Sequence, residues 1–140
     1  MIVYFDASAL AKRYVEEEHS TEVLRWLEES TPAVCRLSEV EIASALARRC
    51  REGALSRLER DRALAALRED LQAFHVVELS PEVVSTASEL LLRHPLRAAD
   101  AVQLGSALML GGRLRTAVAF ATFDERLAVA SQEEGIRPPS

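Results

Sequence analysis

Four acidic residues stand where strand-like sequence gives way to helix-like sequence. Asp6 follows "IVYF", Glu41 lies in "SEVE" after "AVCRL", and Asp124 lies at the end of "TAVAFATFD". The fourth acid, Asp100, opens the very apolar segment "RAADAVQLGSALML". In open α/β sheets, ligands bind outside the carboxyl ends of the strands. The first three acids are therefore predicted to share one edge of a sheet, and Asp100 joins them if its helix packs against that sheet.

Carboxylates gathered at one edge need a compensating positive charge. Like charges at close range repel and raise one another's pKa values, and a helix N-terminus offsets this by only roughly 0.3–1 kcal/mol. These motifs contain no lysine or histidine that is an obvious partner. A hard divalent cation held by oxygen ligands is the simplest source of the missing charge, and carboxylates suit Mg²⁺ or Mn²⁺ better than zinc.

Each acid also has a purely structural interpretation, which stays open at this point. Asp6 and Asp124 could cap the helices that follow them. Ser38 and Glu41 fit the S-x-x-E capping box, in which the glutamate reaches back to the cap residue's N–H. Asp100 could simply complement a helix dipole. A non-enzymatic interaction module whose acids only cap helices is therefore an alternative to a catalytic site.

The order of elements predicts the architecture. Apolar runs read as strands, and segments with helical spacing of apolar residues separate them. Alternating strands and helices indicate a parallel sheet covered by helices on both faces, and hence a three-layer α/β/α domain with four or five strands. The predicted strands are 2–5, 33–37, 75–79 and 116–123, and a fifth, edge strand around 136 is left open. The predicted helices are 20–30, 38–50, 56–74, 81–94, 97–110 and 124–135.

Particular residues set the predicted helix ends and faces. The core face of the helix over 38–50 is expected at Val40, Ala43, Leu46 and Ala47, and that of the helix over 56–74 at Leu58, Leu64, Leu67 and Leu71. Pro81 suits a first helical turn, and Gly111–Gly112 are expected to end the apolar helix.

The composition limits the class of protein. A chain of 140 residues fits one domain spanning 1–140, and 49% hydrophobic residues are enough for a core. The formal net charge of −5 lacks the basic footprint of most nucleic-acid binders, although all cations but Lys12 are arginines, which suit phosphate. The two cysteines make no disulfide framework. With no basic leader and no apolar run of membrane length, we expect a soluble cytoplasmic protein without a membrane partner.

Four motifs, in order, resemble those of PIN-domain proteins, most of all the VapC-type toxins of bacterial toxin–antitoxin pairs. They are "YFDASALAKRYVEEEHS", "SEVEIASALARR", "LRAADAVQLGSAL" and "ATFDERLAVA". The resemblance spans residues 2 to about 131. It implies a parallel sheet between helices, and Mg²⁺- or Mn²⁺-dependent cleavage of RNA. It also implies a small antitoxin as partner, for which the helices 38–51 and 54–73 are the expected surfaces, and a homodimer.

The resemblance assigns the acidic cluster to Asp6, Glu41, Asp100 and Asp124, with hydroxyls at Thr122 and Ser8 beside it. We expect hydrolysis of phosphodiester bonds, in which a metal ion activates water and polarises phosphate. The first three acids would hold the main ion, and Asp124 a second ion or the attacking water. The hydroxyls are expected to orient carboxylates or water. A receiver-like phosphoacceptor domain is a rival, but its late lysine has no counterpart here.

Overall fold

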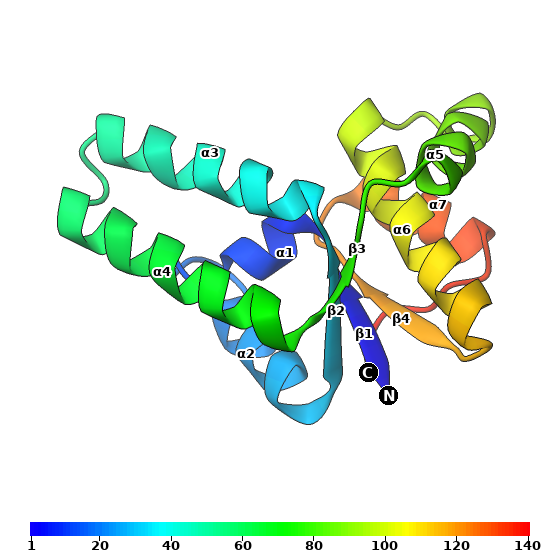
Figure 1. The fold of residues 1–140 in the computed structure, drawn as a ribbon, viewed down its shortest axis with the longest axis horizontal. Coiled ribbons are helices and arrows are strands. Elements are labelled where there is room, and N and C mark those ends of the chain that lie inside the picture. The colour runs from blue at the N-terminus through cyan, green and yellow to red at the C-terminus, as the bar shows by residue number, and fades with distance from the viewer.

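The computed structural model describes residues 1–140 and is built on a four-stranded, wholly parallel sheet (Figure 1). The strands are β1 (Ile2–Phe5), β2 (Thr31–Cys35), β3 (His75–Val77) and β4 (Val118–Ala121), in the order β3-β2-β1-β4. The register pairs Tyr4 with Ala33 on one side and with Phe120 on the other. Because all strands run the same way, their carboxyl ends meet at one edge.

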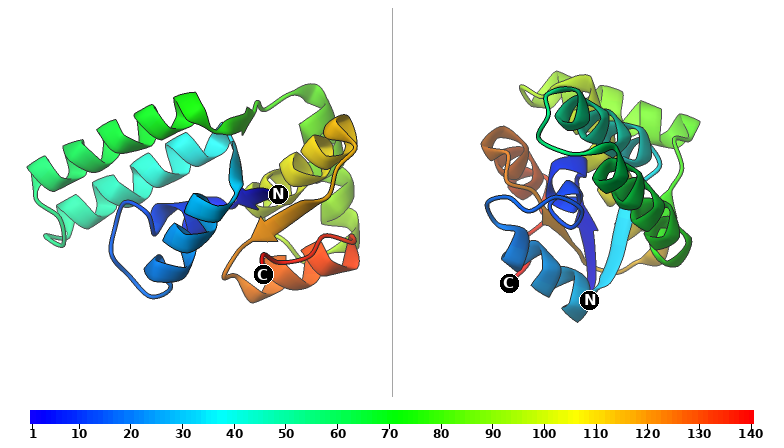
Figure 2. Two further views of the ribbon diagram at one scale, coloured as in Figure 1. Left: turned by 90° about the horizontal axis from the view of Figure 1, so that it is seen from below. Right: turned by 90° about the vertical axis from the view of Figure 1, so that its left-hand side faces the viewer.

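Seven helices cover the sheet on both faces, which confirms the three-layer prediction (Figures 1 and 2). Helices α1 to α4 contribute to the core on one face, and α5 to α7 to the core on the other. None of them is long and apolar enough to cross a membrane. Their bounds are α1 Ala7–Ala11, α2 Ser20–Glu29, α3 Leu37–Arg51, α4 Arg57–Ala73, α5 Pro81–Arg93, α6 Ala98–Leu114 and α7 Glu125–Glu133.

The central strand β1 shows why its sequence is uninterruptedly apolar. Val3 and Phe5 belong to the core shared with α1–α4, whereas Tyr4 belongs to the core shared with α5–α7. All three are at most 3% exposed. A strand of a parallel sheet with helices on both faces has no solvent side, so the apolar/polar alternation of a half-buried strand is absent.

Strand β2 begins earlier than predicted and includes Pro32. Thr31 donates its N–H to the Met1 carbonyl on the β1 side, so the ring nitrogen of Pro32 faces the β3 side. Strand β3 pairs with β2 only from Ala33 onward. A proline therefore removes no hydrogen bond here, which is the condition for proline in a strand.

Helices α3 and α4 form a hairpin that extends away from the sheet (Figures 1 and 2). The Ser56 side chain accepts from the Glu59 N–H at 3.1 Å, and Glu59 accepts from the Ser56 N–H at 2.9 Å. This reciprocal pair is a complete capping box at the start of α4. The predicted capping box at Ser38 and Glu41 is absent, because α3 already begins at Leu37 with Arg36 as its cap residue.

Other predictions about faces and ends are confirmed only in part or are wrong. The predicted core positions Leu46, Leu67 and Leu71 are buried, but Val40 and Leu58 are 66% and 58% exposed. The buried stripes follow Ile42 and Leu46 in α3, and Ala63, Leu67 and Leu71 in α4. Helix α6 runs past both glycines to Leu114 and ends at Arg115, whose φ is 50°. No fifth strand forms: a single backbone hydrogen bond, from Phe120 N–H to the Arg137 carbonyl, joins the C-terminal segment to β4.

Candidate active site

Asp6 occupies the point where β1 ends and α1 begins. Its Oδ1 accepts hydrogen bonds from the Ala9 N–H at 2.8 Å and from the Ser8 hydroxyl at 3.1 Å, and its Oδ2 accepts from the Thr122 hydroxyl at 2.6 Å. The residue is only 4% exposed. The helix-cap interpretation of Asp6 is thus correct. One of its two oxygens is nevertheless held by a hydroxyl from the neighbouring strand end, which a cap does not require.

The environment of Asp6 disfavours its charge. The pKa of Asp6 is raised to about 6, because burial and, to a smaller extent, the negative charge of Asp100 raise it by more than the hydrogen bonds from Thr122, Ala9 and Ser8 lower it. Hydrogen bonds from neutral groups supply no net positive charge, so the charge of an ionised Asp6 is not neutralised by its hydrogen-bond partners.

Glu41 is held by a buried amide. Gln103 is 2% exposed, and its Nε2 donates to Glu41 Oε1 at 2.8 Å and to the Ser38 hydroxyl at 3.0 Å. Its Oε1 accepts from the Tyr4 hydroxyl at 2.7 Å. With both N–H groups and the carbonyl engaged, the amide has one orientation. Burial and the charge of Asp100 raise the pKa of Glu41, and the hydrogen bond from Gln103 lowers it.

Sequence reasoning missed Gln103. Its signal was a single amide within the very apolar segment that follows Asp100. A buried amide needs polar partners, and three residues along a helix place it on the face that carries Asp100. The helix therefore aims the amide at the other predicted acids.

Asp100 and Asp124 complete the group. Asp100 lies in the first turn of α6, where burial and the charge of Asp124 raise its pKa and the charge of Arg97 lowers it. Asp124 caps α7 through a 2.9 Å hydrogen bond from the Leu127 N–H. The Asp124 N–H donates to the Thr122 hydroxyl at 3.1 Å, so Thr122 connects the second acidic strand end to the first.

Asp100 is the member that interacts with all the others. Its charge acts on Asp6 and Glu41, and the charge of Asp124 acts on it. None of the four acids forms an ion pair within 4 Å. Asp100 thus interacts electrostatically with each of the other three acids, and no ion pair neutralises any of the four.

The donor set fits a hard divalent cation in its chemistry. All four side chains offer oxygen, the ligand that Mg²⁺ and Mn²⁺ prefer, and Mg²⁺ keeps several waters rather than requiring a full protein cage. As the side chains stand, however, no group of three or more His, Cys, Asp or Glu residues is close enough to hold one ion. An ion bound here would be held by few direct carboxylate contacts or would draw the side chains inward.

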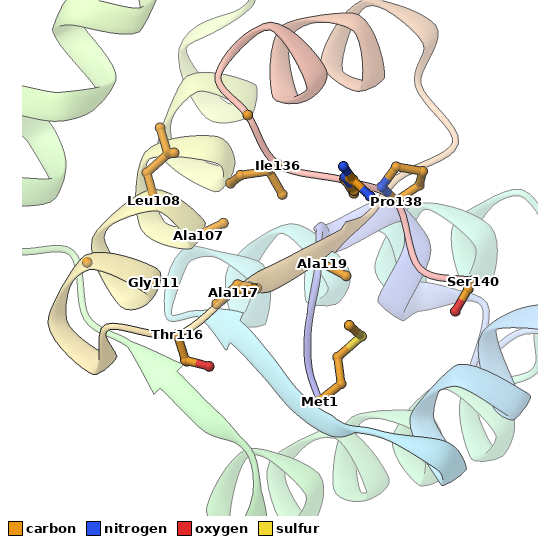
Figure 3. Close-up of a pocket in the computed structure, with 14 residues that line it drawn as sticks. Met1, Ala107, Leu108, Gly111, Thr116, Ala117, Ala119, Ile136, Pro138 and Ser140 are labelled. Atoms are coloured by element: carbon orange, nitrogen blue, oxygen red, sulfur yellow. The ribbon is translucent and has the colours of Figure 1, made fainter.

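Two of the acids border a shallow depression of about 440 Å³, which is lined by Asp100, Phe123 and Asp124 together with Arg97 and Arg126. A larger cavity of about 560 Å³ lies elsewhere, between the end of α6, the start of β4 and the C-terminal segment (Figure 3). None of the four acids lines that cavity. Its walls are largely apolar and carry no pair of titratable side chains, so the chemistry concentrates at the acidic edge.

A parallel three-layer fold with acids at the carboxyl ends of its strands defines the class. Residues 3–132 match the family model described as the PIN domain, and the chain belongs to the PIN-domain family. It is similar to ribonuclease VapC45 of Mycobacterium tuberculosis, with 34% identity over 97% of this chain and 93% of that protein.

Solved structures share the fold at low identity. Mycobacterium tuberculosis VapC20, described as a sarcin–ricin loop cleaving toxin, superimposes with a TM-score of 0.68 at 18% identity, covering 91% of this chain and 94% of that one. A toxin–antitoxin complex from Klebsiella pneumoniae gives a TM-score of 0.62 at 15% identity, covering 90% of each chain. These likenesses show that the chain shares its fold with both structures.

Proposed function

We propose that this protein is a divalent-metal-dependent endoribonuclease that acts as the toxin of a VapBC-like toxin–antitoxin pair. The observation that carries the proposal is the environment of Asp6 at the end of β1. This carboxylate is 4% exposed, the negative charge of Asp100 raises its pKa, and it forms no ion pair. A buried carboxylate without a cationic partner is costly unless a cation joins it. The ribonuclease names of the similar proteins support RNA as the substrate.

The positions of the four acids suggest which role each of them takes. Asp6, Asp100 and Glu41 would hold Mg²⁺ or Mn²⁺, and such an ion supplies a water of lowered pKa and polarises phosphate oxygens. Asp124 would order the attacking water or hold a second ion. Thr122 fixes one oxygen of Asp6 and the backbone of Asp124.

Two further side chains orient the carboxylates. Ser8 donates to the Asp6 oxygen that Thr122 does not contact, and Gln103 fixes Glu41. Such supporting contacts keep ligand oxygens directed at a metal, and their loss costs about 10–100-fold in metal affinity or activity.

The cellular setting is proposed from the relatives. A small antitoxin would bind this chain, by analogy with the Klebsiella pneumoniae structure, which is a toxin–antitoxin complex. A homodimer and a cytoplasmic location follow from the same resemblance. The α3–α4 hairpin is the proposed antitoxin surface, because it extends from the sheet (Figure 1) and, with the chain that follows α1, borders a depression of about 550 Å³.

The deciding experiment is cleavage of a defined RNA by the purified chain in Mg²⁺ or Mn²⁺ and in EDTA. Asp6→Asn and Asp100→Asn are expected to abolish cleavage, and EDTA to do the same. Asp61→Asn, which changes an exposed acid on α4, is the matched control and should cleave like the wild type. Cleavage that persists in EDTA and in both site variants would indicate a contaminating nuclease. It would favour the alternative that this chain is a non-enzymatic interaction module.

A further inference from the structure

Two aromatic rings of the α2 segment stack with a third ring, from the loop that follows β4, beside the acids. The ring centroids of His19 and Phe123 are 4.5 Å apart with 8° between their planes. The ring of Trp26 lies 5.9 Å from that of Phe123 at an interplanar angle of 17°. Phe123 is the residue between Thr122 and Asp124, and it lines the same depression as Asp100 and Asp124. Phe123 is therefore the middle ring of the three, and it places the stack next to the acidic site.

The outer end of this stack faces solvent. The side chain of His19 is 44% exposed. The other parallel pair in the molecule, Tyr4 with Phe120, is fully buried and belongs to the core, with exposures of 0% and 1%. A buried pair is explained by packing, whereas a parallel stack ending in an exposed ring leaves an aromatic face available to another planar group.

One cation accompanies the stack. Lys12 Nζ, from the only lysine of the chain, lies 5.2 Å from the centroid of the Phe123 ring. It also pairs with Glu17 at 3.3 Å, which fixes its position. Lys12 lines a second depression, of about 200 Å³, together with Arg48, Arg49 and Ser8, the residue whose hydroxyl donates to Asp6.

We propose that the stack of His19, Phe123 and Trp26 binds an unpaired base of the RNA next to the scissile phosphate, while Lys12 contacts the backbone of the same strand. Sites for single-stranded nucleic acid combine basic groups along the backbone with aromatic faces for the bases. RNA is recognised mostly through unstacked bases that lie on aromatic side chains. The inference rests on the proposed ribonuclease function and adds a subsite to it.

The test measures binding rather than cleavage. A 5′-fluorescein-labelled single-stranded hexaribonucleotide is titrated with the full chain in EDTA at low salt, and fluorescence anisotropy gives the affinity. The chain is compared with His19→Ala, Phe123→Leu and the conservative His19→Phe. Leu92→Ala, at an 88% exposed position on α5, is the control for loss of an exposed side chain. The same titrations are run with an oligonucleotide that carries abasic sites.

Loss of a stacking face is expected to weaken binding of the intact oligonucleotide about 5- to 100-fold in His19→Ala and Phe123→Leu. His19→Phe should restore it, Leu92→Ala should not change it, and the abasic oligonucleotide should bind the wild type and His19→Ala equally. Wild-type affinity in His19→Ala, or no loss on removing the bases, would overturn the subsite. The subsite would also be overturned if His19→Ala weakened binding of a co-purified antitoxin but left binding of the oligonucleotide unchanged. Cleavage of RNA by the metal-loaded wild type is scored separately, so failure of the nuclease proposal and failure of the subsite are distinguishable.

Discussion

The Nε2 of Gln103 lies 2.8 Å from Oε1 of Glu41, and this contact joins an acid on α3 to a buried amide on α6. The same amide accepts from the Tyr4 hydroxyl, so one side chain connects the central strand, α6 and the acidic edge. The position of Glu41 is therefore set by the core rather than by the surface of its own helix.

Replacing Gln103 by leucine should affect both stability and activity. The Tyr4 hydroxyl would lose its acceptor in a fully buried position, which costs about 1–3 kcal/mol of the free energy of unfolding. Glu41 would lose its donor, and RNA cleavage should fall about tenfold or more. Urea unfolding and cleavage rates measure the two effects.

A double variant separates these effects. Tyr4→Phe combined with Gln103→Leu removes both polar partners in the core and should recover part of the stability. It should recover none of the activity, because Glu41 still lacks its donor. Recovery of both would mean that Gln103 acts only through the fold.

Thr122 is predicted to set the pH at which Asp6 ionises. Its hydrogen bond lowers the pKa of Asp6, so Thr122→Val should raise that pKa above its value of about 6. Metal binding needs the ionised carboxylate, and the pH at which Mn²⁺ binds half-maximally should move upward. Thr122→Ser keeps the hydroxyl and should behave like the wild type. An unchanged pH profile in the valine variant would remove Thr122 from this role.

The metal-free protein should lose stability as pH rises through the range of Asp6 ionisation. An unfolded aspartate ionises near 3.8, whereas burial raises the folded pKa of Asp6 to about 6. Between these values the folded state holds a proton that the unfolded state has lost, so the free energy of unfolding falls as pH increases, by about 3 kcal/mol in all. The loss is nearly complete about one pH unit above the folded pKa of Asp6.

Asp6→Asn cannot ionise and should lack this component. The difference in urea-unfolding free energy between the wild type and the variant, measured in EDTA at several pH values, isolates it. The stability of the variant relative to the wild type should rise between pH 4 and pH 7. A pH-independent difference would show that Asp6 has an ordinary pKa in the folded protein.

The capping box at Ser56 offers a change that is confined to the fold. Ser56→Ala removes the acceptor of the Glu59 N–H and should lower the free energy of unfolding by about 1 kcal/mol. Thermal unfolding measures this loss. RNA cleavage should be unaffected at a temperature where the variant is folded, and a large loss of activity would mean that the α3–α4 hairpin takes part in the reaction.

The architecture could be predicted because it depends on local patterns. Apolar runs bounded by helical spacing indicated all four strands and their parallel arrangement, and acids at strand ends could be located by topology alone. The faces of α3 and α4 could be predicted only in part, because Val40 and Leu58 are apolar residues placed in solvent, and spacing does not tell an exposed apolar residue from a buried one.

Contacts between residues far apart in the chain could not be predicted from the sequence either. Gln103 with Glu41 and His19 with Phe123 meet only after the helices pack, at separations of 62 and 104 residues. Gly111 and Gly112 were expected to end α6, but both take helical geometry, and the left-handed position falls at Arg115. Glycine permits a helix end without requiring it.

The central claim, that the four acids bind a dication, is tested most directly by following thermal unfolding of the wild type, Asp6→Asn, Asp100→Asn and Asp61→Asn while Mn²⁺ is titrated from zero. A ligand that binds only the folded state stabilises it by mass action, by about 2.7 kcal/mol at a hundred times its dissociation constant. The wild type and Asp61→Asn should show a rising unfolding temperature that saturates, and the two site variants should show none. Equal shifts in all four proteins, or no shift in any, would contradict the account.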